Sequence, residues 1–133
     1  MKVLVTGANG FIGKNLLIHL RERGIDNLTF LRGDSLDALD AKVAQAEFIF
    51  HLAGVNRPKM ESEFEEGNAN LTQALCDAVK RSGRQVPIIY ASSVQAELPN
   101  AYGASKRAAE DALRALASEA DLPVYIYRLP NVF

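Results

Sequence analysis

Short apolar runs alternate with amphipathic stretches along the whole chain. Strands are predicted where apolar residues run consecutively, at 2–6, 27–32, 47–53, 86–91 and 124–128. Helices are predicted where apolar residues recur every three or four positions, at 11–23, 35–46, 61–82 and 105–120. Strands that alternate with helices in this order indicate βαβ units. We therefore expect an α/β fold, a doubly wound parallel sheet with helices on both faces.

Composition narrows the class of protein. The 133 residues suffice for one domain, 1–133, and 48% of them are hydrophobic, enough for a packed core. The net charge is −1, which argues against the basic surface of a nucleic-acid binder. No apolar run has the length of a membrane span. The single cysteine, Cys76, lies in an apolar helical pattern, where a buried small side chain is expected. A soluble, cytoplasmic protein is predicted, with neither nucleic-acid nor membrane partners.

A glycine-rich segment joins the first predicted strand to the first helix. It reads Thr6-Gly7-Ala8-Asn9-Gly10-Phe11-Ile12-Gly13. Glycines at this place allow a tight turn, close approach of a pyrophosphate and close packing of the helix, whose N-terminus favours an anion. The alternative is a tight turn with no ligand. We predict a Rossmann-like dinucleotide site, with cofactor contacts from Thr6, Gly7, Asn9, Gly10, Phe11, Ile12 and Gly13.

A second candidate group follows the fourth predicted strand. Tyr102 and Lys106 are four residues apart at the start of a helix, so both side chains lie on one helix face. A nearby ammonium favours the phenolate, which suits the phenol to proton transfer. Ser92 and Ser93 end the preceding strand, where a hydroxyl could polarise a carbonyl. The alternative is that Tyr102 and Lys106 are an exposed pair of side chains four residues apart on a helix, with no catalytic role.

Together these residues resemble the extended branch of the short-chain dehydrogenase/reductase family, the NAD-dependent epimerase/dehydratase type that modifies nucleotide sugars. The resemblance covers essentially the whole chain. Its further motifs are His51-Leu52-Ala53-Gly54, Asn68 in the following helix, and Arg128-Leu129-Pro130-Asn131-Val132-Phe133. By this resemblance Tyr102 would protonate the sugar oxygen, Lys106 would bind the nicotinamide ribose, and Ser93 would hold the carbonyl. Metal ions have no role in this interpretation.

The resemblance also implies the remaining contacts. Cofactor contacts would come from Arg32, Leu52, Ala53, Gly54, Asn68, Ala91, Ser92, Tyr102 and Lys106. Substrate contacts would come from Asn56, Arg57, Ser93 and Asn131. Asn68 would support Lys106 through water, although a purely structural polar residue is nearly as good an interpretation. His51 is assigned no chemistry.

Three segments are similar to a narrower group, the capsular polysaccharide reductases that form UDP-N-acetyl-L-fucosamine. They are His51–Pro58, Ser92–Ala96 and Tyr125–Arg128. This similarity implies reduction of a 4-keto UDP-sugar with NADPH in surface polysaccharide biosynthesis. A nucleotide-sugar epimerase or dehydratase is the alternative enzyme. Val94-Gln95 stands where dehydratases usually carry an acidic pair, which counts against dehydration. A cofactor-binding module without turnover is the non-enzymatic alternative.

Several features depart from the family pattern. The region between the second predicted strand and His51 is short, so an edge strand near the adenine is expected to be missing. Arg32 at the end of the second strand suits a 2′-phosphate and favours NADP(H), whereas Asp34 keeps NAD(H) open. Only nine positions separate Ser93 from Tyr102, which predicts a compact turn around Pro99-Asn100.

The end of the chain is a further departure. It stops at Phe133, where the resemblance places the start of the substrate-binding segment. We therefore expect a truncated chain that lacks the C-terminal substrate-binding lobe and that could be inactive alone. Family members are often dimers through two long helices, and the helices predicted at 61–82 and 105–120 permit a homodimer by analogy.

Overall fold

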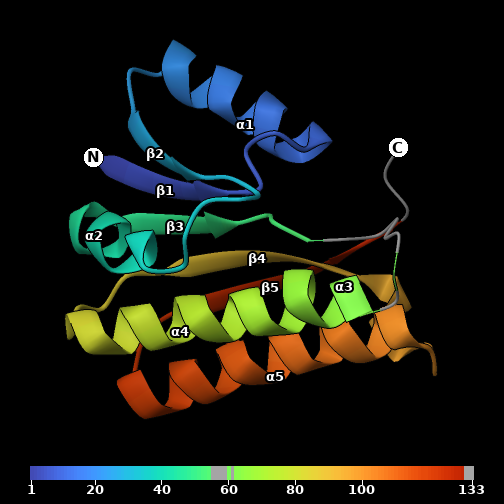
Figure 1. Ribbon diagram of the computed structural model, residues 1–133. Coiled ribbons are helices and arrows are strands. Elements are labelled where there is room, and N and C mark those ends of the chain that lie inside the picture. The colour runs from blue at the N-terminus through green and yellow to red at the C-terminus, as the bar shows by residue number, and fades with distance from the viewer. Residues whose placement is uncertain (55–59, 61, 131–133) are drawn as a thin grey trace.

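The computed structural model describes residues 1–54, 60 and 62–130, and within them five parallel strands form one sheet (Figure 1). The strands are β1 (Lys2–Thr6), β2 (Asp26–Phe30), β3 (Phe48–His51), β4 (Ile88–Ser93) and β5 (Val124–Leu129). Their order across the sheet is β2-β1-β3-β4-β5, and every neighbouring pair is parallel. The predicted α/β class with a Rossmann-like parallel sheet is confirmed.

Helices lie on both faces of the sheet. Figure 1 shows α1 (Phe11–Glu22) on one side and α2 (Ala38–Gln45), α4 (Leu71–Ser82) and α5 (Ala101–Ala120) on the other. Successive side chains of a strand point to opposite faces, so β1 contributes to two cores. Val3 and Val5 pack with Leu20 of α1, whereas Leu4 belongs to the larger core under α2, α4 and α5.

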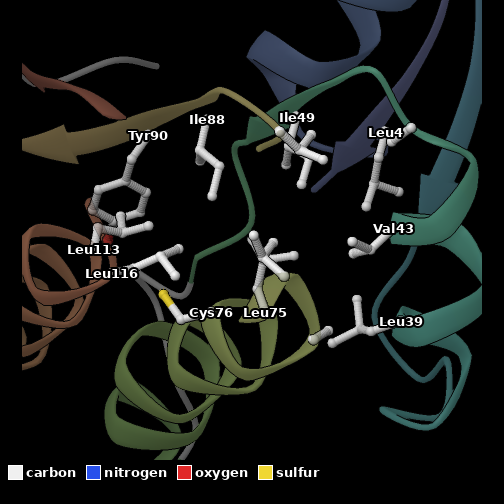
Figure 2. Packing of buried hydrophobic residues seen from close by; sticks show 14 of the residues in the cluster. Leu4, Leu39, Val43, Ile49, Leu75, Cys76, Ile88, Tyr90, Leu113 and Leu116 are labelled. Carbon is white, nitrogen blue, oxygen red and sulfur yellow. The ribbon is translucent and has the colours of Figure 1, made fainter. Parts of the chain in front are cut away.

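The larger core holds the apolar positions that the helical periodicity identified. Figure 2 shows Leu39 and Val43 of α2, Leu75 and Cys76 of α4, and Leu113 and Leu116 of α5 facing strand residues Leu4, Ile49, Ile88 and Tyr90. Burial, the largest cause, raises the pKa of the Cys76 thiol to about 12. Cys76 is therefore a packed small side chain, as predicted, and not a nucleophile.

The predicted helix at 61–82 is interrupted. Its described part consists of α3 (Ser62–Phe64), a π-helix η1 (Glu65–Asn70) and α4. A π-helical turn inserts an extra residue and shifts the helix face that follows it, and such turns are frequent at functional sites. Apolar periodicity cannot detect one extra residue, so the prediction of one continuous helix was wrong in this respect.

Two other boundaries bear on the candidate site. The strand predicted to end at Arg32 ends at Phe30, because the Asp34 carboxylate accepts the Leu31 N–H at 2.8 Å and closes a turn. The helix predicted to begin at Ser105 begins at Ala101, because the Asn100 side chain accepts the Gly103 N–H at 2.8 Å and caps the helix. Tyr102 therefore lies inside the first turn of α5.

The short connection between the second strand and His51 contains α2 alone, as expected. Residues 31–47 are all described, and β2 is the edge of the described sheet. None of the helices in the described ranges is long and apolar enough to cross a membrane.

Candidate functional site

The glycine loop packs tightly between strand β1, helix α1 and the end of β3. Gly7 has φ +70°, and a Cβ there would lie 2.6 Å from the Ala53 nitrogen. A Cβ on Gly13 would lie 2.2 Å from the Gly7 carbonyl oxygen. Side chains at either position would collide with backbone, so both glycines are needed for this turn. The loop leaves the N-terminus of α1 open, as a pyrophosphate site requires.

A cavity of about 710 Å³ lies beside the glycine loop, within the size range of small-molecule sites. Its lining comes from that loop, the turn after β2, the segment after β3, and α3 with η1. The predicted residues that line it are Gly7, Asn9, Gly10, Arg32, Leu52, Ala53 and Gly54. The structure therefore brings the predicted residues together from three separate segments, at the carboxyl ends of parallel strands where ligands bind in such sheets.

Four other predicted cofactor residues, Thr6, Phe11, Ile12 and Gly13, are not among the residues that line the cavity. Phe11 and Ile12 begin α1, where the Phe11 side chain is exposed and that of Ile12 half-buried, and Gly13 is buried beneath them. Thr6 is buried at the end of β1, and its hydroxyl oxygen accepts the backbone N–H groups of Leu52 and Ala53, each at 3.1 Å. Thr6 therefore shapes the cavity wall through its neighbours.

A buried chain of hydrogen bonds runs from Thr6 to the π-helix. The Thr72 hydroxyl donates to the Asn68 carbonyl oxygen at 2.6 Å, so it accepts from Nε2 of His51 at 2.8 Å. His51 Nδ1 then accepts from the Thr6 hydroxyl at 2.7 Å. Burial, the larger cause, and the charge of Lys106 lower the pKa of His51 to about 3. His51 is thus a neutral structural link, in agreement with its having no assigned chemistry.

Asn68 lies in η1 with its side chain buried between two parts of the site. Its Nδ2 donates to the Ser105 hydroxyl at 2.9 Å, and that hydroxyl donates to the Tyr102 carbonyl oxygen at 2.7 Å. A Cβ on Gly54 would lie 2.9 Å from Asn68 Oδ1 and 3.0 Å from Lys106 Nζ. Asn68 and Lys106 therefore meet at Gly54, which also lines the cavity.

Lys106 is buried, with only 6% of its surface exposed. Its Nζ donates to the Ala91 carbonyl oxygen at 3.5 Å and lies 5.2 Å from the centroid of the Tyr90 ring. The same atom is 5.9 Å from the Tyr102 ring centroid, so the predicted side-by-side placement is observed. Burial lowers the pKa of Lys106 to about 8, against the opposing attraction of Glu110. The ammonium thus loses its proton close to the neutral range.

Tyr102 and Ser93 occupy the neighbouring positions. The half-buried Tyr102 ring meets Phe64 edge-on, with 5.3 Å between the ring centroids. Ser93, at the end of β4, accepts the Gln95 N–H at 3.1 Å and so caps the 3₁₀-helix η2 (Val94–Glu97). The connection to Tyr102 is compact, as predicted, but its helical turn is at Val94–Glu97, ahead of Pro99-Asn100.

Ser92 points elsewhere. Its hydroxyl donates to Glu110 Oε2 at 2.6 Å, in a buried cluster that also contains Arg128. Neighbouring residues of a strand face opposite sides, so Ser92 and Ser93 cannot both serve the same site through their side chains. The predicted cofactor contact of Ser92 is thus limited to its backbone.

The turn after β2 contains Arg32 and Asp34, the two residues that bear on the choice between NADP(H) and NAD(H). The Arg32 side chain is 81% exposed, and its Nη2 lies 3.9 Å from Glu63 Oε1 at the cavity wall. Asp34 Oδ2, in contrast, accepts the Leu31 N–H and lies 3.4 Å from Lys42 Nζ. Hydrogen bonding to Leu31, the largest cause, lowers the pKa of Asp34. Both side chains line the cavity, where Arg32 faces Glu63 and Asp34 also closes its own turn.

Three predicted substrate residues, Asn56, Arg57 and Asn131, lie outside the described residues. In turn, sequence reasoning missed Tyr90, Glu110 and Gly103. Glu110 continues the spacing of Tyr102 and Lys106 by one more helical turn, a signal that was available. Within the described ranges, no group of three or more His, Cys, Asp or Glu side chains could hold a metal ion.

Comparison with known proteins gives a consistent picture. Residues 3–133 match the sequence model of the NAD dependent epimerase/dehydratase family. The chain is 57% identical over 134 residues to a UDP-2-acetamido-2,6-beta-L-arabino-hexul-4-ose reductase of Pseudomonas aeruginosa, covering 100% of this chain and 36% of that protein. It is 30% identical over 152 residues to a ceramide reductase of Caulobacter vibrioides, covering 98% of this chain and 46% of that protein.

Two solved structures extend the comparison. The capsular polysaccharide assembling protein CapF from Staphylococcus aureus superposes with a TM-score of 0.84 at 40% identity, over 100% of this chain and 36% of that one. UDP-glucuronic acid 4-epimerase from Bacillus cereus, in complex with NAD, gives a TM-score of 0.85 at 19% identity, over 100% and 57%. The second likeness concerns the fold alone. This chain thus spans less than half the length of the two curated relatives named above.

Proposed function

Because the chain belongs to the NAD-dependent epimerase/dehydratase family, we propose that it is the cofactor-binding part of a nucleotide-sugar oxidoreductase. The reaction proposed is reduction of a 4-keto UDP-sugar for surface polysaccharide biosynthesis, with NADPH as the reductant. The similarity to the Pseudomonas reductase and to CapF supports this substrate class. We further propose that the protein acts in the cytoplasm.

One observation carries the proposal. Gly54 lines the large cavity and also stands where a Cβ would be 3.0 Å from Lys106 Nζ. The buried ammonium therefore lies next to a residue that lines the cavity beside the glycine loop. A dinucleotide needs this combination, with a phosphate cradle at one end and a ribose ligand at the other. The cavity volume also fits such a cofactor.

The residues of this chain would divide the work as follows. The glycine-loop backbone and the N-terminus of α1 would hold the pyrophosphate, and Lys106 would bind the nicotinamide ribose. The bound nicotinamide cofactor supplies hydride. Ser93 would donate a hydrogen bond to the substrate carbonyl, and the Tyr102 phenol would transfer its proton to the same oxygen. The Lys106 charge favours the phenolate that remains.

NADPH is the proposed cofactor because of the turn after β2. Arg32 is exposed at the cavity wall, where a guanidinium suits a 2′-phosphate. Asp34, which would select the 2′-hydroxyl of NAD, is held by the Leu31 N–H and Lys42. We also propose a homodimer through α4 and α5, the two helices that Figure 1 shows side by side. Sedimentation at several concentrations tests the dimer.

The test of function is a comparison of Tyr102→Phe with the unaltered protein, using NADPH and a 4-keto UDP-sugar. The variant should bind NADPH with unchanged affinity and lose at least about 100-fold in turnover, the usual contribution of a general acid. Turnover that survives in Tyr102→Phe would contradict the catalytic role.

The cofactor is tested separately by calorimetry with NADPH and NADH. NADPH should bind more tightly, and Arg32→Ala should remove the difference by weakening NADPH alone. Arg23→Ala is the matched control, because Arg23 is an exposed arginine at the far end of α1. An unchanged preference in Arg32→Ala would show that Arg32 does not read the 2′-phosphate.

A further inference from the structure

The Tyr90 ring lies between the sheet and the site at a position that no catalytic role explains. Tyr90 is in the middle of β4, pairs with His51 of β3 in register, and is fully buried. Figure 2 shows it projecting from the strand into the core that contains Leu113 and Leu116 of α5. The Tyr90 ring stacks with the His51 ring at 5.2 Å between centroids. Lys106 Nζ lies 5.2 Å from the centroid of the Tyr90 ring.

The hydroxyl of Tyr90 does not account for this placement. It is buried and has no hydrogen-bond partner among the described residues. Burial, the largest cause, raises the pKa of Tyr90 well above its usual value, so the phenol stays neutral. A buried polar group without a partner costs free energy, and its retention gives no benefit that the contacts reveal. The part of Tyr90 that contacts a functional group is its ring.

The buried Lys106 ammonium needs a favourable electrostatic contact. Within the described ranges, this ammonium has one hydrogen bond, a long one of 3.5 Å to the Ala91 carbonyl oxygen. A cation near the face of an aromatic ring within about 6 Å is attracted by the ring quadrupole, more strongly when water is excluded. The Tyr90 ring meets this distance, and its position in a central strand holds it rigidly.

The other ionisable groups near Lys106 do not provide the contact that the Tyr90 ring makes with its ammonium. On α5, Tyr102 has its ring centroid 5.9 Å from Nζ, and Glu110 attracts the ammonium but is itself paired with Arg128 of β5. On β3, His51 is neutral. On η1, which packs on α5, Glu65 and Glu66 are exposed to solvent.

We propose that Tyr90 is a positioning residue whose ring face holds the Lys106 ammonium at the Gly54 end of the cavity and favours its charged form. The role of Lys106 as ribose ligand rests on the proposed function. The contact between ring and ammonium does not, because both groups belong to this chain.

The test replaces Tyr90 with phenylalanine and then with mono-, di- and trifluorinated phenylalanine. These rings keep nearly the same shape, but each fluorine makes the ring face less negative. The measurement is the titration of the Lys106 ammonium by NMR, in the protein without cofactor. From phenylalanine to the trifluorinated ring, the pKa of Lys106 should fall stepwise by about 0.4–0.7 unit in total, which corresponds to about 0.5–1 kcal/mol for such a contact.

Two comparisons separate an electrostatic role from packing. Tyr90→Phe alone should leave the Lys106 titration unchanged, because the lost hydroxyl has no described partner. The same fluorinated residues at Tyr127, an exposed position of β5, should have no effect. A Lys106 pKa that is constant along the series, or that shifts equally at Tyr127, would overturn the proposal. Absence of NADPH binding in the unaltered protein, with the stepwise shift of the Lys106 pKa intact, would count against the proposed function alone.

Discussion

Glu110 of α5 and Arg128 of β5 form a two-point ion pair, with 2.9 Å from Nε to Oε2 and 2.8 Å from Nη2 to Oε1. The Glu110 side chain is fully buried, and the Ser92 hydroxyl donates to the same Oε2. The pair therefore joins the helix that carries Tyr102 and Lys106 to the two strands beside it. Glu110 is the point at which these three elements are held in register.

This arrangement makes a prediction about acid stability. Burial raises the pKa of Glu110, but hydrogen bonds from Arg128 and Ser92 outweigh it and hold the pKa below 4.5. A lowered folded-state pKa contributes stability above the unfolded value, which is lost as pH falls through the folded value. Glu110→Gln should lower the free energy of unfolding by about 2 kcal/mol at neutral pH and reduce its loss below pH 4.5.

Urea unfolding along a pH series measures both effects. Glu97→Gln is the matched control, because Glu97 pairs with the same Arg128 at 2.9 Å but is 77% exposed. Exposed pairs of this kind contribute little, so that variant should unfold almost like the parent protein. Equal losses in the two variants would contradict the importance of the buried pair.

His51 predicts a second pH dependence, in a different window. Its pKa falls from 6.5 to about 3 on folding, chiefly through burial. Between pH 6.5 and 3, His51 is therefore protonated in the unfolded chain but not in the folded protein. The free energy of unfolding should decline as pH falls through this range, by up to about 1.4 kcal/mol per pH unit.

The hydrogen-bond order also determines the tautomer of His51. Nitrogen-15 NMR should find the neutral ring with its proton on Nε2, since that nitrogen donates to Thr72 and Nδ1 accepts from Thr6. His19, which is exposed on α1, is the reference resonance in the same spectra. A native His51 that becomes protonated near pH 6 would disprove the assignment.

Gly54→Ala should weaken cofactor binding more than it lowers the stability of the fold. The new Cβ would meet Asn68 Oδ1 at 2.9 Å and Lys106 Nζ at 3.0 Å, which are the ends of side chains and can move. We expect NADPH affinity to fall by roughly 10–100-fold, the value of one hydrogen bond to a charged group, with little change in unfolding. Calorimetry and urea unfolding measure the two quantities.

Gly24→Ala is the control for that substitution. A Cβ there meets nothing within 4 Å, although φ is +68°, so it reports backbone strain away from the site. It should lower stability and leave NADPH binding unchanged. A Gly54→Ala variant that behaves in the same way would show that Lys106 does not need the space at Gly54.

Gly103→Ala should instead destabilise the start of α5. Its Cβ would lie 2.3 Å from the Leu98 carbonyl oxygen and 2.7 Å from that of Gln95, both backbone atoms of the compact connection. Overpacking against backbone costs about 1–3 kcal/mol. Ala104→Ser, at an exposed neighbouring position, is the control. Thermal unfolding with near-parental stability for Gly103→Ala would mean that η2 can move away from α5 at little cost.

Much of the fold was predictable because its signals are local. Apolar runs identified five strands, and helical spacing identified α1 on one face of the sheet and α2, α4 and α5 on the other. Asn100 was predicted to be part of a turn, but its capping of α5, which moves the start of that helix to Ala101, was missed. The π-helix at 65–70 was also missed, because one inserted residue does not disturb an apolar pattern.

The candidate site divides in the same way. The sequence by itself determined that a glycine loop follows β1 and that Tyr102 and Lys106 share a helix face, since both depend on backbone geometry over a few residues. Only the tertiary structure decided that Ser92 turns to Glu110, that Asp34 closes its own turn, and that Tyr90 meets Lys106. These contacts join residues from different elements, and which atoms meet there depends on how the sheet and helices pack, a property that no local pattern contains.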